Sequence, residues 1–125
     1  MKDHKLGKLF AAGEVIFREG EVGECMYVIQ KGQVKVTKGT GVGEATIAVL
    51  GEGEVFGEMA LFDLKPRSAT TTAFGEARVL CIDRKRLFSV VKRDPTIVFK
   101  IIKSLSDRIR RLDDKVAEME AGKHM

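Results

Sequence analysis

The first 83 residues consist of short apolar and β-branched runs, most of them closed by a turn that contains glycine. Short strands at roughly even spacing, with glycine turns between them, are typical of an antiparallel sandwich or barrel. We therefore expect an all-β arrangement in this part of the chain. The predicted strands are Val15–Phe17, Met26–Ile29, Val34–Val36, Thr46–Leu50, Ser68–Phe74 and Ala77–Ile82.

At Asp83 the pattern changes to that of helices. Asp83 suits the N-cap of a helix over Arg84–Val91, and Pro95 suits the first position of a second helix, which we expect to reach about Glu120. A chain of 125 residues, 44% of them hydrophobic, predicts one domain, with strands over about 10–83 and helices over 84–121. No run of about 18 apolar residues and no secretory leader is visible, so we expect a cytoplasmic protein without a membrane partner.

The second predicted helix carries apolar residues at alternating intervals of four and three. In this heptad pattern the a positions are β-branched and most d positions are leucine or similar, which favours two parallel helices. Flanking pairs such as Arg108 and Asp113 would be of opposite sign, so we expect a parallel homodimer through residues 98–120. The alternative is a single amphipathic helix packed on its own domain, and Phe99 and Ile101, which lie off the seam, predict such packing at the helix start. The seam residues are Val98, Ile102, Leu105, Ile109, Leu112, Val116 and Met119.

The stretch from Phe56 to Arg67 combines features that suit an anion. A strand is expected to end at Phe56, and Gly57 lets the backbone approach another group closely. The residues from Glu58 favour a short helical turn, whose N–H groups attract an anion. Arg67 can lie beside those groups, and its guanidinium matches phosphate oxygens in a fork. Glu58 fits such a site if the ligand also carries hydroxyl donors, as a ribose does; the alternative is a surface turn with an ion pair.

Three segments, in order and spacing, resemble the cyclic nucleotide-binding domain family, which includes the bacterial catabolite activator protein and the regulatory subunits of protein kinase A. The segments are Met26–Ile29 between Gly20 and Gly32, the cassette Phe56–Leu61, and Pro66–Thr70. The resemblance covers about residues 9–121. It implies an eight-stranded antiparallel jelly-roll β-roll followed by a short helix and a long C-terminal helix.

The resemblance also implies a non-enzymatic regulatory domain that binds a cyclic nucleotide and transmits binding through its long helix. In the family's pattern Arg67 pairs with the cyclic phosphate, Glu58 accepts from the ribose 2′-hydroxyl, and Ser68 bonds the phosphate or the base. We expect cAMP rather than cGMP, because a threonine in place of Ser68 more often accompanies cGMP. The base should lie toward the long helix, where Asp113–Val116 replaces the hydroxyl residues of the catabolite activator. The expected ligand-binding residues, including backbone N–H donors, are Gly57, Glu58, Met59, Ala60, Arg67, Ser68 and Ala69.

Other functions fit the residues less well. His4 and His124, at opposite ends, cannot supply the metal cluster of a phosphodiesterase or a cupin, so we expect no enzymatic activity, no metal and no cofactor. Cys25 and Cys81 lie in apolar runs and are expected to be buried, reduced thiols; if exposed, they could serve a haem sensor of the same fold. Two further alternatives are a dimerisation module that has lost its ligand and the sensor half of a transcription regulator without its DNA-binding domain.

The basic charge of the chain is confined to its helical part. Residues 84–125 hold 12 Lys and Arg against 6 Asp and Glu, whereas residues 1–83 hold 10 against 12. A basic helix can indicate nucleic acid, but a solvated helix face is its more common origin. Nothing after the long helix could serve as a recognition helix, so we expect no direct DNA binding.

Overall fold

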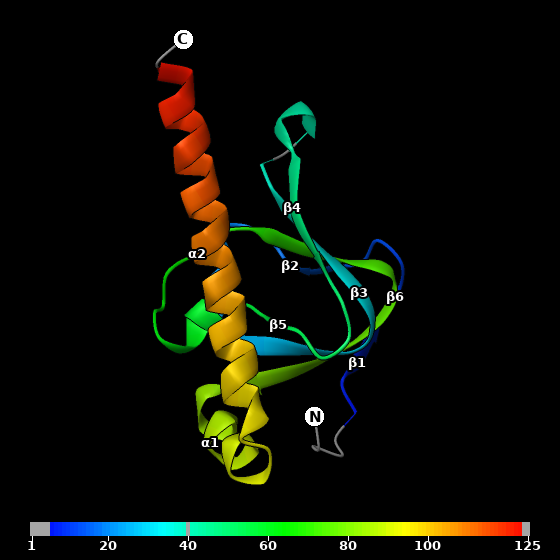
Figure 1. Ribbon diagram of the computed structural model, residues 1–125. Coiled ribbons are helices and arrows are strands. Elements are labelled where there is room, and N and C mark those ends of the chain that lie inside the picture. The colour runs from blue at the N-terminus through cyan, green and yellow to red at the C-terminus, as the bar shows by residue number, and fades with distance from the viewer. Residues whose placement is uncertain (1–5, 40, 124–125) are drawn as a thin grey trace.

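The computed structural model describes residues 6–39 and 41–123, and its strands form one antiparallel sheet (Figure 1). Two strands of 14 residues, β3 (Cys25–Lys38) and β6 (Thr70–Asp83), pair with each other and organise the sheet. The path through the sheet is β1-β6-β3-β4. β1 (Lys8–Phe10) and β2 (Val15–Phe17) pair with β6, and β4 (Ala45–Leu50) and β5 (Val55–Phe56) pair with β3.

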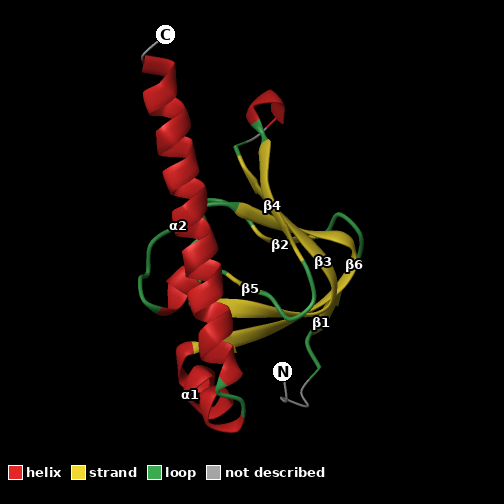
Figure 2. Cartoon of the chain, viewed as in Figure 1, coloured by secondary structure: helices red, strands yellow, loops and turns green. Residues whose placement is uncertain are grey.

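Both long strands bend at a glycine. The pairing of β3 with β6 shifts register on either side of Lys31, and Gly32 and Gly75 there have φ angles of 84° and 80°. Because glycine adopts positive φ without strain, each strand bends and continues, and the sheet curls into a roll (Figure 2). The expected antiparallel β-roll with two helices is confirmed. The described residues form six strands, because four of the short predicted strands continue into one another as β3 and β6.

The two helices follow the roll directly. Asp83 is both the last residue of β6 and the N-cap of α1 (Arg84–Arg93), and its carboxylate accepts from the Arg86 N–H at 2.7 Å. α2 (Thr96–Lys123) begins after Pro95, and the Thr96 N–H donates to the Asp94 carboxylate at 3.2 Å. The predicted start of α1 is confirmed, whereas α2 begins one residue after the predicted Pro95 and continues past Glu120. Two short 3₁₀ turns, η1 (Gly41–Gly43) and η2 (Glu58–Leu61), lie in the roll.

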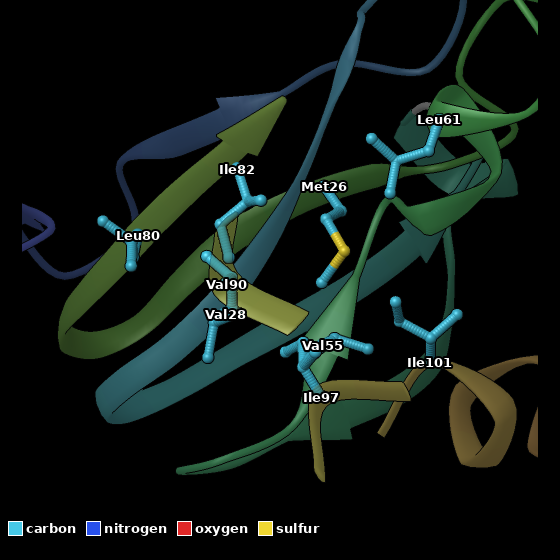
Figure 3. Close-up of a cluster of buried hydrophobic side chains, with 9 residues drawn as sticks. All are labelled: Met26, Val28, Val55, Leu61, Leu80, Ile82, Val90, Ile97 and Ile101. Carbon is cyan, nitrogen blue, oxygen red and sulfur yellow. The ribbon is translucent and has the colours of Figure 1, made fainter. Parts of the chain in front are cut away.

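The apolar core has two parts. One fills the space between the roll and the two helices (Figure 3) and the other lies within the roll. The first consists of Met26, Val28, Val55, Leu61, Leu80, Ile82, Val90, Ile97 and Ile101. The second consists of Phe10, Ile29, Val34, Phe56, Ala73, Ala77 and Val79.

Only the beginning of α2 packs on the domain. Ile97 and Ile101 are buried, as predicted for Ile101, but Phe99 is 72% exposed, so that prediction is wrong. Phe99 follows Ile97 by two residues, which is a rotation of more than half a turn around the helix axis. The Phe99 side chain therefore points to the opposite side of the helix. The C-terminal half of α2 stands clear of the sheet in Figure 1, and no helix in the described ranges is long and apolar enough to cross a membrane. The exposed seam residues are Val98, Ile102, Ile109, Leu112, Val116 and Met119.

The cysteines are less buried than the sequence suggested. Cys25 is half-buried and Cys81 is exposed, so the prediction of two buried thiols is wrong. Leu80 and Ile82 point into the core, and since side chains alternate along a strand, Cys81 between them faces outward. His4 and His124 lie outside the described residues, as does the charged start of the chain.

Candidate functional site

A cavity of about 270 Å³ opens between the roll and α2. Its walls come from the β5–η2 segment, the residues that lead into β6, and one side of α2. All seven residues predicted to bind ligand line it: Gly57, Glu58, Met59, Ala60, Arg67, Ser68 and Ala69. The structure therefore brings together in one cavity the residues that the sequence singled out.

The Arg67 side chain lies in a fixed, buried position at the wall of this cavity. Its guanidinium donates to the Gly57 carbonyl at 3.0 Å and to the Cys25 carbonyl at 2.9 Å. The guanidinium carbon lies 4.1 Å from the centre of the Phe17 ring and 5.8 Å from that of Tyr27, within cation–π range. Only 7% of Arg67 is exposed. The charge is thus held by two carbonyls and two rings in a largely dehydrated place.

Two glycines make room for the guanidinium. A Cβ at Gly57 would lie 2.8 Å from Nη1 of Arg67, and a Cβ at Gly23 would lie 2.2 Å from Nη2. Gly57 also has a φ of 73°, which favours glycine. Sequence reasoning identified Gly57 but missed Gly23, because nothing near Gly23 in a chain with 13 glycines connects it to Arg67.

Glu58 is also buried, at 2% exposure, and its Oε1 accepts from the Ser104 hydroxyl of α2 at 2.5 Å. Because Glu58 and Arg67 are both buried, the alternative of a surface turn is wrong. Ser104 was missed by sequence reasoning, since a polar residue on a helix gives no signal of which strand segment it faces. The contact joins η2 to α2 at the cavity wall.

The cassette forms the short turn that the sequence predicted. η2 begins after Gly57, and the Ala60 N–H donates to the Gly57 carbonyl at 3.3 Å. Ala60 and Ala69 are buried, whereas Ser68 and Met59 are exposed. The expected backbone donors thus lie around a turn that opens onto the cavity.

The wall formed by α2 is polar and mostly basic. Lys103 donates to Asp107 at 2.8 Å and approaches Glu54 at 3.8 Å, and the bond from Lys103 lowers the pKa of the Asp107 carboxyl. The helix meets the cavity before Asp113–Val116, the segment to which the resemblance pointed. The residues of α2 that line the cavity are Lys100, Lys103, Ser104, Asp107, Arg108 and Arg111.

Thr71 is a further cavity residue that sequence reasoning missed. It is 2% exposed, and its hydroxyl has no hydrogen-bond partner among the described residues. Three threonines in a row read as a β-strand, and nothing in the run distinguishes the one that faces the cavity. Within the described ranges, no group of three or more His, Cys, Asp and Glu could hold a metal ion.

The sequence of this chain is similar to the sequences of known proteins. A sequence model described as "Cyclic nucleotide-binding domain" matches residues 8–94. The CRP-like cAMP-activated global transcriptional regulator of Mycobacterium tuberculosis is 32% identical over 111 residues, which cover 88% of this chain and 50% of that protein. The chain thus spans about half the length of such relatives.

Two solved structures are similar as well. The Thermus thermophilus catabolite activator protein shares 31% identity with a TM-score of 0.74, over 90% of this chain and 54% of that one. The EAL enzyme Bd1971 in its cAMP-bound form shares 33% identity with a TM-score of 0.63, over 88% of this chain and 29% of that one. The same enzyme is also known in a cGMP-bound form.

Proposed function

Because this chain belongs to the cyclic nucleotide-binding domain family, we propose that it is a regulatory domain that binds cAMP, in preference to cGMP, in the cavity beside Arg67. The observation that carries the proposal is the buried guanidinium of Arg67 in the same cavity as the buried carboxylate of Glu58. A buried charge is unfavourable unless it is paired and hydrogen-bonded, and the phosphate of an anionic ligand would pair with Arg67.

Arg67 is suited to bind the cyclic phosphate. A guanidinium has five N–H donors, and the carbonyls of Gly57 and Cys25 engage two of its nitrogens. The two carbonyls and the Phe17 ring hold the side chain in place, so little side-chain freedom is lost when the ligand binds. The N–H groups of Gly57 to Ala60 and of Ala69, with the Ser68 hydroxyl, are the expected further contacts with phosphate and sugar, and the Ala60 N–H would share its donor between the ligand and the Gly57 carbonyl.

Glu58 is suited to bind the sugar. Its carboxylate is an acceptor, and a ribose 2′-hydroxyl is a donor of the kind that Ser104 already supplies. A ligand hydroxyl would therefore share Glu58 with Ser104 or replace it. In either case, a ligand in the cavity would change the hydrogen bond that Ser104 of α2 makes.

This contact supports α2 as the element that transmits binding. α2 forms one wall of the cavity, and its seam residues beyond the core contact are exposed. We propose that ligand shifts α2 against the roll and that the exposed seam joins a second copy as a parallel homodimer. An apolar seam of this kind is the usual basis of two-stranded helix pairing.

Two alternative functions can be compared with the structure of the cavity. A dimerisation module without ligand would have no need of a cavity with a buried arginine and a buried glutamate, and both are present. A sensor half of a transcription regulator is compatible with the proposal, since such a half would bind the same ligand. The matched family is a binding domain, and we propose no catalytic role for the chain.

Titration calorimetry with cAMP, cGMP and AMP tests the proposal. We expect cAMP to bind most tightly, and AMP weakly, because the ring-opened phosphate has a different shape and charge. A hundredfold excess over Kd should stabilise the fold by about 2.7 kcal/mol, a clear rise in Tm. No heat and no rise in Tm with either cyclic nucleotide would contradict ligand binding, whereas tighter binding of cGMP would contradict only the stated preference.

A further inference from the structure

Cys25 and Cys81 lie beside each other on one face of the central strand pair. In the register of β3 with β6, Cys25 is opposite Asp83 and Tyr27 is opposite Cys81. Directly opposed side chains share a face, so the two cysteines are diagonal neighbours on the same side of the sheet. Their side chains lie close enough for each cysteine to shift the pKa of the other.

A small reagent can reach the pair. Both cysteines are free, Cys25 is half-buried and Cys81 is exposed. Cys81 and Tyr27 line a second surface hollow, of about 480 Å³, which shares no lining residue with the ligand cavity. A reagent can thus reach Cys81 from this hollow, and the half-buried Cys25 beside it is in part open to solvent.

The surroundings of the two sulfurs make them chemically different. The hydrogen bond from Cys81 lowers the pKa of Cys25 to about 6, and the Tyr27 hydroxyl and the Arg67 charge act in the same direction against the effect of burial. The pKa of Cys81 is raised, first by the hydrogen bond to Cys25 and also by burial and Asp83. Cys25 is therefore the more acidic sulfur of the pair, and the thiolate is the form of cysteine that peroxides oxidise.

We propose that Cys25 and Cys81 are a peroxide-responsive dithiol that closes into a reversible disulfide within the chain, directly behind Arg67. The Cys25 thiolate attacks one oxygen of hydrogen peroxide, the O–O bond breaks, and hydroxide leaves, which forms a sulfenic acid at Cys25. The Cys81 sulfur then attacks that sulfur, the S–S bond forms, the S–O bond breaks, and the oxygen leaves as water with the Cys81 proton. Overall, two thiols and one peroxide give one disulfide and two waters.

The geometry favours a bond that is easily reduced again. Diagonal neighbours on an antiparallel pair have Cα atoms roughly 7–8 Å apart, somewhat beyond the usual disulfide range of about 4.4–6.8 Å. Closing the bond therefore draws β3 and β6 together and strains it, and strained disulfides are the labile, regulatory ones. A dithiol reductant restores both thiols by exchange.

The disulfide would act on the neighbouring site through one main-chain contact. The Cys25 carbonyl accepts from Nη2 of Arg67 at 2.9 Å, so a shift of Cys25 moves an anchor of the guanidinium. Oxidation also removes the thiolate charge that faces Arg67. The oxidation itself needs no nucleotide, so it goes beyond the proposed function.

Peroxide treatment of the whole chain, followed by alkylation and intact and peptide mass measurement, tests the proposal without any nucleotide. We expect a chain lighter by two hydrogens, unreactive to the alkylating agent, with Cys25 and Cys81 linked in one peptide pair, and full recovery after a dithiol reductant. Cys81→Ser should stop at a sulfenic acid on Cys25 that dimedone traps, and should react about tenfold faster at pH 7 than Cys25→Ser does at Cys81. Two alkylatable thiols after peroxide, a disulfide only between chains, or equal rates in the two variants would overturn the proposal.

Discussion

The Ser104 hydroxyl of α2 donates a hydrogen bond to the Glu58 carboxylate of η2 at 2.5 Å, although 46 residues separate them. The bond joins the helix that leads out of the domain to the turn at which we propose the ligand binds. Site and helix therefore share one acceptor, and a ligand hydroxyl that reaches Glu58 must act on that bond.

Ser104→Ala should tighten cAMP binding by up to about tenfold, because the ligand hydroxyl gains an acceptor without displacing another donor. The same change should lower the free energy of unfolding without ligand by about 1–3 kcal/mol, since a buried carboxylate loses a donor. Calorimetry and urea unfolding measure the two effects. Ser106→Ala, an exposed serine on the same helix, is the control and should change neither quantity. Weaker cAMP binding by the Ser104 variant would contradict the shared acceptor.

Arg67→Ala should weaken cAMP binding by about 2–5 kcal/mol, which is roughly 30-fold to a few thousand-fold, because the ligand phosphate loses a desolvated charge partner. The matched control is Arg78→Ala, in which another arginine of the roll loses its bond to the Gly7 carbonyl, away from the cavity. Calorimetry on both variants, after circular dichroism has shown that each is folded, gives the comparison. Equal losses in the two variants would show that Arg67 has no direct role.

Gly57→Ala and Gly20→Ala separate backbone strain from contact with Arg67. Both glycines have positive φ, at 73° and 91°, so each alanine should cost about 1–2 kcal/mol of stability. Only the Cβ at position 57 would meet the guanidinium, at 2.8 Å, whereas a Cβ at position 20 meets no atom within 4 Å. We expect at least tenfold weaker cAMP binding for Gly57→Ala alone, measured by calorimetry. Similar binding by both variants would speak against a fixed position of Arg67.

Ile109→Glu should disrupt the proposed homodimer, because it places a charge in the middle of the exposed apolar seam. Sedimentation should give twice the chain mass of 13.8 kDa for the unaltered protein and a single chain for the variant. Arg110→Glu adds the same side chain at an exposed position off the seam and should leave the mass doubled. A monomeric unaltered chain at the highest soluble concentration would rule the seam out as a self-association surface.

The pH dependence of the Cys25 alkylation rate should show the effect of Cys81 on the pKa of Cys25. Thiolate forms above the pKa, so the rate with iodoacetamide should rise through about pH 6 and be level by pH 8, far below the ordinary value of 9.0. Cys81→Ala removes the first cause of the shift and should move the midpoint toward 9.0. Cys81→Ser keeps a donor and should keep the midpoint low. A midpoint above pH 8 in the unaltered chain would contradict the thiol pair.

The strand positions could be predicted because glycines mark where each run ends, but the bends could not. Gly32 and Gly75 were interpreted as turns between separate strands, and the structure uses the same positive φ to bend one continuous strand. A glycine signal does not distinguish these outcomes, because the choice depends on whether the partner strand bends at the same place. β1 was missed because only two of its three residues are apolar, whereas all three residues of β2 are apolar and β-branched or aromatic.

The candidate site also contains residues that could be predicted from the sequence and residues that could not. Arg67 and Glu58 could be found because the resemblance assigned them roles, whereas a charged pair beside a glycine turn is by itself equally typical of a surface ion pair. Gly23 and Ser104 could not be found, because their importance comes from a distant side chain that lies against them. The heptad pattern predicted α2 itself, whereas the part of α2 that lines the cavity depends on how Ile97 and Ile101 pack against the roll and α1.

The junction at Asp83, where the strand ends and the helix begins at one residue, leaves no slack between the two parts of the molecule. A hinge needs a few residues of free backbone, and here the capping hydrogen bond to Arg86 fastens the first turn of α1 to the strand. We therefore expect a twist of β6 to turn the start of α1 with it. A reporter fused after Lys123 would respond to the roll through α1 and α2 in series. The two residues between the helices are Asp94 and Pro95, and Asp94 is held to both helices, because its N–H donates to the Val90 carbonyl and its carboxylate accepts from the Thr96 N–H.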